Sequence, residues 1–214
     1  MADIKFCGLT REKDAAFVPV VGADYAGVIF AGGPRELTPE RAASIFTAAG
    51  ADIHRVGVFG ADFRERVPSV VSQVSLDVIQ LHGDPTVADV RDARKLFDGI
   101  VWAAVRVRGS TIPGSVAELF GEADAVLLDA LAPGALGGTG RRLPWPALAD
   151  DLDKVRAGAM LVLAGGLVPD NVGDAIAALD PDVVDVSSGV ELSPGVKDHE
   201  KMTEFVYAAR RSER

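Results

Sequence analysis

The stretch Ile4-Lys5-Phe6-Cys7-Gly8-Leu9-Thr10, near the start of the chain, has the pattern of a short buried strand. In a strand, Ile4 and Phe6 point to one face, and Lys5 and Cys7 point to the other. An apolar face opposite a Lys/Cys pair suits a strand of a closed barrel, with helices outside and a reactive mouth inside. We expect this strand to end at Cys7 and Thr10 to be the N-cap of the first helix.

Similar apolar runs, rich in valine and isoleucine, recur at spacings of roughly twenty to thirty residues, the length of a strand–helix unit. The expected strands are Ile4–Cys7, Tyr25–Phe30, Arg55–Phe59, Val78–Leu81, Ile100–Val105, Ala125–Asp129, Met160–Leu163 and Val183–Val186. Continuous apolar runs are typical of parallel strands that are buried on both faces. Eight strand–helix alternations favour an α/β fold of the (β/α)₈ type, a TIM barrel, over an open doubly wound sheet. We expect residues 1–214 to form a single domain of this kind.

Helix signals lie between most of the runs. The first helix is expected to turn Ala15, Ala16 and Val20 inward. The second should open at Thr38-Pro39-Glu40, which supplies an N-cap, a proline at the first helical position and an acidic first turn. Other expected segments are a sixth helix around Ala147–Val155, a seventh opening at Pro169-Asp170-Asn171 and a last one following Lys197-Asp198.

Composition narrows the possible partners. The net charge of −9 argues against nucleic acid or an anionic membrane as the main partner. The sequence has no run of about 18 apolar residues and no N-terminal pattern of a secretory signal. The single cysteine, Cys7, cannot form an internal disulfide. We therefore expect a cytoplasmic protein that acts on a small molecule, as a monomer or a homodimer.

In a (β/α)₈ barrel the active site is built from the carboxyl ends of the strands and the loops that follow them. The residues at these positions that could carry chemistry are Cys7, Arg35, His82, Asp129, Gly165, Gly166, Ser187, Ser188 and Gly189. The glycines and serines after the seventh and eighth strands have unhindered amides next to a helix start, which suits a phosphate. Barrels commonly bind phosphate at this place. The alternative is that the glycines only turn corners and the serines only cap a helix.

Asp129 ends an apolar run in the expected barrel mouth and shares the inner face with Leu127. A carboxyl under the glycine-rich stretch Ala132–Leu143, which we expect to be a lid, could have its pKa raised enough to act as a general acid. The alternative is that Asp129 only caps the following loop.

Cys7 would lie across the barrel from Asp129. A free thiol has a pKa of about 8.5, which neighbouring cations lower. Lys5, one layer below Cys7, could be such a cation or could be a structural partner of an inner acid such as Asp185. The alternative for Cys7 is a small buried hydrophobic residue.

His82 is expected to face inward at the end of the fourth strand, where a histidine can be structural or functional. Arg35 follows the second strand and could bind a substrate carboxylate with both ends of its guanidinium, or be a solvated loop residue. The sequence holds only three histidines and no clustered acid near them, so we expect no metal site.

These motifs, in this order, resemble those of the phosphoribosylanthranilate isomerase family of tryptophan biosynthesis over nearly the whole chain. They are Lys5-Phe6-Cys7-Gly8-Leu9-Thr10, Arg55-Val56-Gly57-Val58-Phe59, Gln80-Leu81-His82-Gly83, Leu128-Asp129, Gly137-Gly138-Thr139-Gly140, Gly165-Gly166-Leu167-x-Pro169-x-Asn171-Val172 and Asp185-Val186-Ser187-Ser188-Gly189-Val190-Glu191. Each motif alone is weak, but together they are specific.

The resemblance implies an Amadori rearrangement of N-(5-phosphoribosyl)anthranilate to the 1-deoxyribulose isomer, without metal or cofactor. By matching motif, Asp129 would be the general acid that protonates the furanose ring oxygen. Cys7 would be the general base that removes the C2 proton. Arg35 would bind the anthranilate carboxylate, and the two glycine/serine loops would bind the phosphate.

The chain departs from the family pattern at three places. Leu143-Pro144-Trp145 stands where the family more often has Phe-Asp-Trp, and Phe59-Gly60-Ala61 where an asparagine often begins the third helix. Trp102-Ala103-Ala104 lacks a lysine that commonly precedes the final alanine. None of these removes a proposed catalytic group. The alternatives are another phosphosugar barrel, such as a ribulose-phosphate epimerase or a different aldose–ketose isomerase, and a barrel that only binds a phosphorylated ligand.

Overall fold

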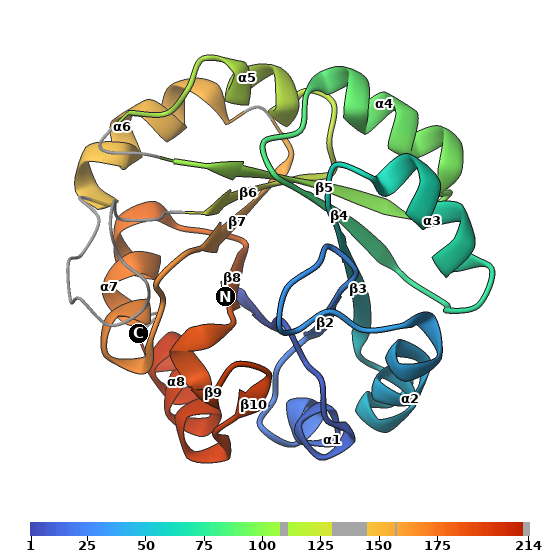
Figure 1. Ribbon diagram of the computed structural model, residues 1–214. Helices are drawn as coiled ribbons and strands as arrows, with labels where there is room; N and C mark the ends of the chain where they lie inside the picture. Colours follow the sequence, from blue (N-terminus) through green and yellow to red (C-terminus); the bar gives the residue numbers. More distant parts are fainter. Residues whose placement is uncertain (108–110, 130–144, 157, 212–214) are drawn as a thin grey trace.

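The computed structural model describes residues 1–107, 111–129, 145–156 and 158–211. Eight parallel strands pair in chain order and close into a barrel, with β1 also paired to β8 (Figure 1). The strands are β1 Asp3–Phe6, β2 Tyr25–Ile29, β3 His54–Phe59, β4 Val78–His82, β5 Ile100–Arg106, β6 Ala125–Asp129, β7 Met160–Ala164 and β8 Val183–Val186. The predicted (β/α)₈ class is confirmed, and each observed strand end lies within one residue of its predicted position.

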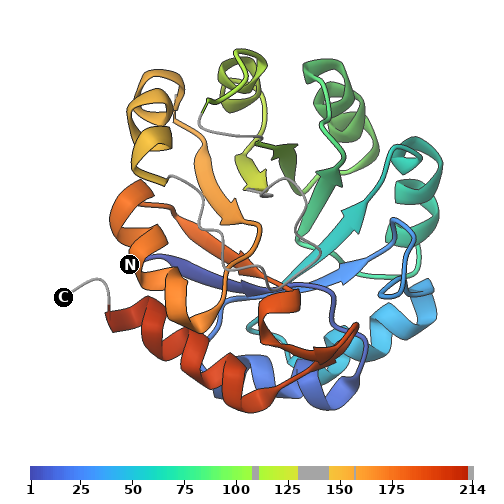
Figure 2. The same ribbon diagram turned by 60° about the vertical axis from the view of Figure 1, so that its left-hand side comes forward.

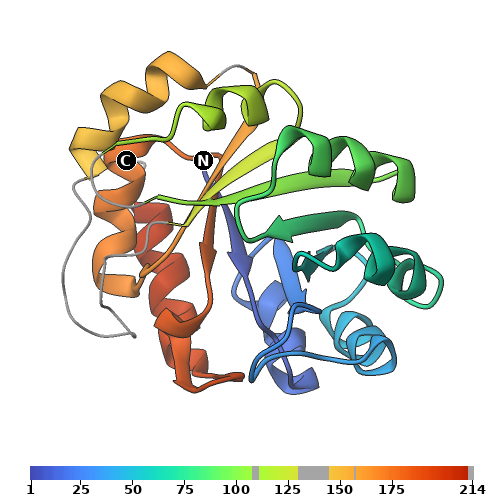
Figure 3. The ribbon, with the colours of Figure 1, turned by 45° about the horizontal axis from the view of Figure 1, so that its top comes forward.

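The helices lie outside the ring of strands, as the two rotated views also show (Figures 2 and 3). They are α1 Glu12–Val20, α2 Pro39–Ala49, α3 Phe63–Val71, α4 Val87–Leu96, α5 Ser115–Phe120, α6 Trp145–Val155, α7 Pro169–Leu179 and α8 His199–Arg211. A short 3₁₀ helix, η1 Ser188–Val190, follows β8 and leads into a small hairpin of β9 Glu191–Ser193 and β10 Val196–Lys197. Among the described helices, none is long and apolar enough to span a membrane.

Most helix starts follow the sequence signals. The Thr38 side chain accepts a hydrogen bond from the Arg41 amide at the start of α2, and Pro169 occupies the first turn of α7. The prediction for the first helix is wrong in two respects. Its N-cap is Arg11, because the Thr10 hydroxyl donates instead to the Gly195 carbonyl in the β9–β10 hairpin.

The inward face of α1 also differs from the prediction. Asp14, Ala15 and Val18 are buried, whereas Ala16 and Val20 are exposed. Residues three and four apart share a helix face, so Ala15 and Val18 lie together and Ala16 turns to solvent. The buried Asp14 is held by Arg11, three residues away, and by two groups far along the chain, His199 and the Lys197 amide.

Two apolar layers stabilise the barrel. The larger one, which includes Ile4 and Phe6 as predicted, packs the outer face of the strands against the helices. The smaller one fills the barrel interior with residues such as Tyr25, Val78 and Trp102. Trp102, which precedes the departure from the family pattern at Ala103, is fully buried there, with its ring 5.3 Å from that of Tyr25.

Three polar side chains interrupt the inner layer. The Lys5 ammonium donates to Asp185 Oδ2 at 2.8 Å and to Gln80 Oε1 at 2.9 Å. The strand register explains the meeting, because Lys5 on β1 lies directly opposite Asp185 on β8. This polar layer lies one step below Cys7 and separates the apolar interior from the barrel mouth.

Candidate active site

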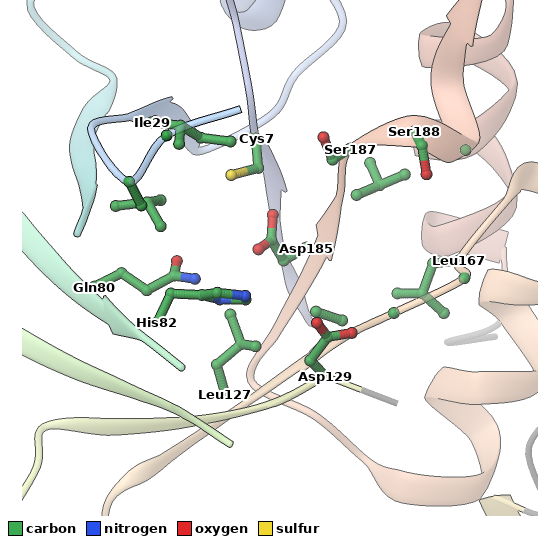
Figure 4. Close-up of a pocket in the computed structure, with 18 residues that line it drawn as sticks. Cys7, Ile29, Gln80, His82, Leu127, Asp129, Leu167, Asp185, Ser187 and Ser188 are labelled. Atoms are coloured by element: carbon green, nitrogen blue, oxygen red, sulfur yellow. The ribbon is translucent and has the colours of Figure 1, made fainter. Parts of the chain in front are cut away.

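A pocket of about 370 Å³ opens at the carboxyl ends of the strands (Figure 4). It brings together eight of the nine side chains or glycines that the sequence singled out. They are Cys7, His82, Asp129, Gly165, Gly166, Ser187, Ser188 and Gly189. Arg35 is the exception, since it does not line this pocket in the described structure.

Cys7 follows directly after β1, where its amide donates to the Val186 carbonyl at 2.9 Å. Its side chain lines the pocket but is only 7% exposed. Burial raises the pKa of the thiol above its ordinary value, and the charges of Lys5 and Lys197 only partly oppose this. The nearby cations do lower the thiol pKa, as expected, but the net shift is upward, because loss of hydration disfavours the thiolate more than these cations favour it.

Asp129 is the last residue of β6 and faces Cys7 and Asp185 across the pocket (Figure 4). Burial raises the pKa of its carboxyl, and the negative charge of Asp185 adds to the effect. His82 and Arg106 act in the opposite direction. A carboxyl whose pKa is raised keeps its proton to higher pH, which is what a general acid requires. The direction predicted for Asp129 is confirmed.

Asp185 lies between Cys7 and Asp129 in the pocket wall (Figure 4). One carboxylate oxygen is held by Lys5, and the other, Oδ1, is buried without a hydrogen-bond partner among the described residues. Lys5 is thus the structural partner of Asp185, one of the two roles expected for it. Burial works against the charge of this ammonium, but Asp185 and Cys7 together outweigh burial, so the Lys5 pKa is raised.

The two glycine/serine loops form one continuous wall of the pocket. Gly165 and Gly166 have φ angles of 85° and 67°, which residues with side chains rarely adopt. A Cβ atom on Gly189 would lie 1.9 Å from the Leu167 carbonyl oxygen, so only glycine lets η1 approach the loop after β7 this closely. The wall is made of glycines and small residues and adjoins the starts of η1 and α7, which suits an anion.

His82 and Arg35 differ in their placement. His82 ends β4, is exposed, and lines the pocket with its ring directed toward Asp129 (Figure 4). Arg35 lies over Gly8 and pairs with Glu191 through two hydrogen bonds, Nε–Oε1 at 2.9 Å and Nη2–Oε2 at 2.6 Å. It is therefore not a solvated loop arginine, since its guanidinium is fixed beside the pocket.

Sequence reasoning named Asp185 only as a possible partner of Lys5 and missed three other residues around the site. Gln80 is a polar residue within an apolar strand run, and that interruption was the available signal. Glu191 closes the last family motif, and Lys197 was used only to place the last helix. The structure does not describe the expected lid, Ala132–Leu143, or the departure from the family pattern at Leu143-Pro144, since both lie outside the described part of the chain. The described residues contain no group of three or more His, Cys, Asp or Glu side chains that could hold a metal ion.

Comparison with known proteins decides the family. The model of the family described as N-(5'-phosphoribosyl)anthranilate (PRA) isomerase matches residues 4–208. The chain belongs to this family. The N-(5'-phosphoribosyl)anthranilate isomerase of Rubrobacter xylanophilus is 42% identical over 213 residues, which cover 98% of this chain and 100% of that protein.

Solved structures of PRA isomerases agree. The crystal structure of phosphoribosyl anthranilate isomerase from Thermotoga maritima superposes with a TM-score of 0.85 at 35% identity, covering 99% of this chain and 100% of that one. A second structure, also of a PRA isomerase, holds reduced 1-(o-carboxyphenylamino)-1-deoxyribulose 5-phosphate. It has a TM-score of 0.81 at 33% identity, with 99% and 100% of the two chains covered. The predicted family is confirmed.

Proposed function

We propose that this PRA isomerase uses Asp129 as general acid and Cys7 as general base in the Amadori rearrangement of N-(5-phosphoribosyl)anthranilate. The product is 1-(2-carboxyphenylamino)-1-deoxyribulose 5-phosphate. The observation that carries the assignment is that both groups line one pocket from different strand ends, beside the wall of backbone amides. An acid and a base that reach one sugar from two sides, next to an anion site, suit an isomerisation that moves protons on a phosphosugar.

The first step opens the ring. Asp129 gives its proton to the furanose ring oxygen while the bond from C1 to that oxygen breaks, and the anilino nitrogen supplies the electron pair that forms the C1=N bond. The product of this step is a protonated Schiff base, whose nitrogen keeps its hydrogen, with a free C4 hydroxyl. The raised pKa of Asp129 supports the role, because it enlarges the protonated fraction near neutral pH.

The second step moves a proton from C2. The Cys7 thiolate removes it, and the electrons of the C–H bond form a C1=C2 double bond as the C1=N bond becomes a single bond to a neutral amine. The resulting enolamine gains a proton at C1, and its C2 hydroxyl loses one to give the ketone. The thiolate needed here is a minor form of free Cys7, because burial raises its pKa. The step is therefore expected to speed up as the thiol ionises.

Binding groups would hold the two ends of the substrate. The phosphate fits the loops around Gly165, Gly166, Ser187, Ser188 and Gly189, where backbone amides and small side chains meet. Arg35 presents its Nε–Nη2 edge to Glu191, which leaves the Nη1 end for the anthranilate carboxylate. His82 would contact the substrate from the β4 side. A cytoplasmic location and the choice between monomer and homodimer stay predictions.

The experiment that tests the activity follows the loss of anthranilate fluorescence when the purified chain meets N-(5-phosphoribosyl)anthranilate. We expect first-order decay well above the spontaneous rate, with no change in the spectrum of a ribulose 5-phosphate control. Decay at the spontaneous rate, or turnover of the control sugar alone, would contradict the proposal and favour a different phosphosugar isomerase or epimerase.

A further inference from the structure

Lys197 is a buried lysine near the active site that the mechanism above does not use. It ends β10, lies outside the barrel sheet, and is 2% exposed. Its ammonium donates to the Cys7 carbonyl at 2.6 Å, to the Ser187 carbonyl at 3.0 Å and to Glu191 Oε1 at 2.9 Å. An ammonium has three N–H donors, so these acceptors saturate it.

The acceptors come from the two segments that carry the proposed chemistry. Cys7, the proposed base, follows directly after β1, and Ser187 begins the glycine/serine loop after β8 that lines the pocket. No backbone hydrogen bond between described residues joins those two carbonyls, because both groups are acceptors. A buried cation between them satisfies both and fixes the distance between base and anion wall.

Glu191 extends the same cluster to Arg35. Its Oε1 accepts from Lys197 Nζ and Arg35 Nε, both at 2.9 Å, and from the Gly195 amide at 3.2 Å. Burial works against ionisation of this carboxyl, but the hydrogen bonds from Arg35 and the charge of Lys197 lower the pKa of Glu191 to about 2. The carboxylate is therefore charged at neutral pH and holds both cations in place.

The positive charge of Lys197 also affects the ionisation of the Cys7 thiol. Lys197 and Lys5 are the two cations whose fields favour the Cys7 thiolate against burial, and Asp185 opposes them. Lys5 is committed to Asp185, which cancels much of its effect. The Lys197 ammonium is shared between Glu191 Oε1, at 2.9 Å, and the Cys7 carbonyl, at 2.6 Å, so it stays next to the backbone of Cys7.

We propose that Lys197 is a positioning residue. It fixes the position of the base Cys7 relative to the glycine/serine loop at Ser187 and, through Glu191, fixes Arg35. This inference rests on the proposed role of Cys7. It assigns the β9–β10 hairpin a function, namely to place the Lys197 ammonium between the carbonyls of Cys7 and Ser187, which directly follow β1 and β8. Lys197 touches no substrate in this scheme and acts through the residues that do.

The test compares Lys197→Met with Lys197→Arg and with Lys201→Met as matched control. Lys201 also contacts this hairpin, donating to the Glu191 carbonyl at 3.1 Å, but it is 42% exposed and does not reach Cys7. Because Cys7 is the only cysteine, the pH dependence of iodoacetamide labelling reports its thiol directly. Loss of a cation within a few Å is expected to shift the labelling midpoint of Lys197→Met upward by about one pH unit.

In Lys197→Met we further expect kcat to fall by about tenfold or more, with Lys197→Arg restoring part of the loss and Lys201→Met unchanged in both readouts. If Lys197→Met fails to fold, Glu191→Gln keeps the shape of the cluster and should raise KM more than it lowers kcat, because Arg35 loses its charged anchor.

If Lys197→Met folds and keeps the wild-type labelling midpoint and kcat, the proposal is overturned. If Lys197→Met does not fold, a wild-type KM in Glu191→Gln overturns it. The labelling midpoint does not depend on turnover. A shifted midpoint together with full activity in Cys7→Ser would contradict the role of Cys7 as base and leave the contact between Lys197 and Cys7 standing.

Discussion

The ammonium of Lys5 and the carboxylate of Asp185 form an ion pair inside the barrel, with 2.8 Å between Nζ and Oδ2 and side chains 0% and 7% exposed. Two buried charges gain little net stability from each other, because both lose hydration. Removing one partner destabilises the fold, since the other charge stays buried without compensation. Neither Lys5 nor Asp185 can therefore be replaced by an uncharged residue without a loss of stability.

Lys5→Met is expected to lower the free energy of unfolding by about 3–5 kcal/mol, because Asp185 is left as an uncompensated buried charge. Urea denaturation followed by circular dichroism measures this. Lys95→Met is the control, since Lys95 is 73% exposed and pairs with Asp92 on α4, where about 1 kcal/mol or less is expected. Equal effects of the two substitutions would show that the inner pair is solvated.

Asp129→Asn is expected to stabilise the protein at neutral pH and to leave its stability unchanged in acid. The pKa of Asp129 is raised in the folded state, so folding favours the protonated form. Wild type then has its full stability below pH 3.8, the ordinary value, and loses part of it as pH rises through the folded pKa. The neutral amide does not titrate. Stability curves of the two proteins that stay parallel from pH 3 to pH 7 would contradict the raised pKa.

Glu191→Gln should show the opposite pH dependence. The pKa of Glu191 is lowered from 4.5 to about 2 in the folded protein, so its carboxylate stabilises the fold fully above pH 4.5 and loses this effect as pH falls through about 2. The variant is expected to be less stable than wild type at pH 6, with the gap narrowing below pH 4.5. Acid titration of urea midpoints checks this, and a constant gap would show that Glu191 is not ionised in the cluster.

Ser188→Asp should weaken substrate binding, because it places a carboxylate beside the proposed phosphate. Two like charges about 4 Å apart repel by about 4 kcal/mol near a protein surface, so KM should rise by about a hundredfold or more. Ser188→Ala is the uncharged control and should change KM by less than about tenfold. A normal KM in Ser188→Asp would place the phosphate elsewhere.

The strands could be predicted from the sequence because each is a local apolar run bounded by polar residues, and the barrel followed from their number and spacing. The error at Thr10 has a different origin. A threonine before a helix is a good N-cap locally, but its hydroxyl is taken by Gly195 from a hairpin that lies 185 residues further along the chain. Local patterns carry no information on such a contact.

The residues of the candidate site could be predicted from the sequence, but their burial and the charges around them could not. Cys7 and Asp129 could be placed because both stand at strand ends, where a barrel gathers its chemistry. The direction of the shift in the thiol pKa could not be predicted, since it depends on how deeply Cys7 is buried and on the opposing charges of Lys5, Lys197 and Asp185 around it. Lys197 lies 190 residues from Cys7, and only the closed barrel brings them together.

The acid–base assignment is tested most directly by Asp129→Asn, with turnover and binding measured on the same sample. Turnover is followed by anthranilate fluorescence, and binding by titration with reduced 1-(o-carboxyphenylamino)-1-deoxyribulose 5-phosphate. Asp180→Asn, at the opposite end of the barrel where α7 ends, is the matched control and should behave as wild type. Because a general acid acts in the transition state, we expect kcat of Asp129→Asn to fall by about 10²–10⁴-fold while the dissociation constant changes by less than about tenfold. Near-normal turnover in Asp129→Asn would contradict the account.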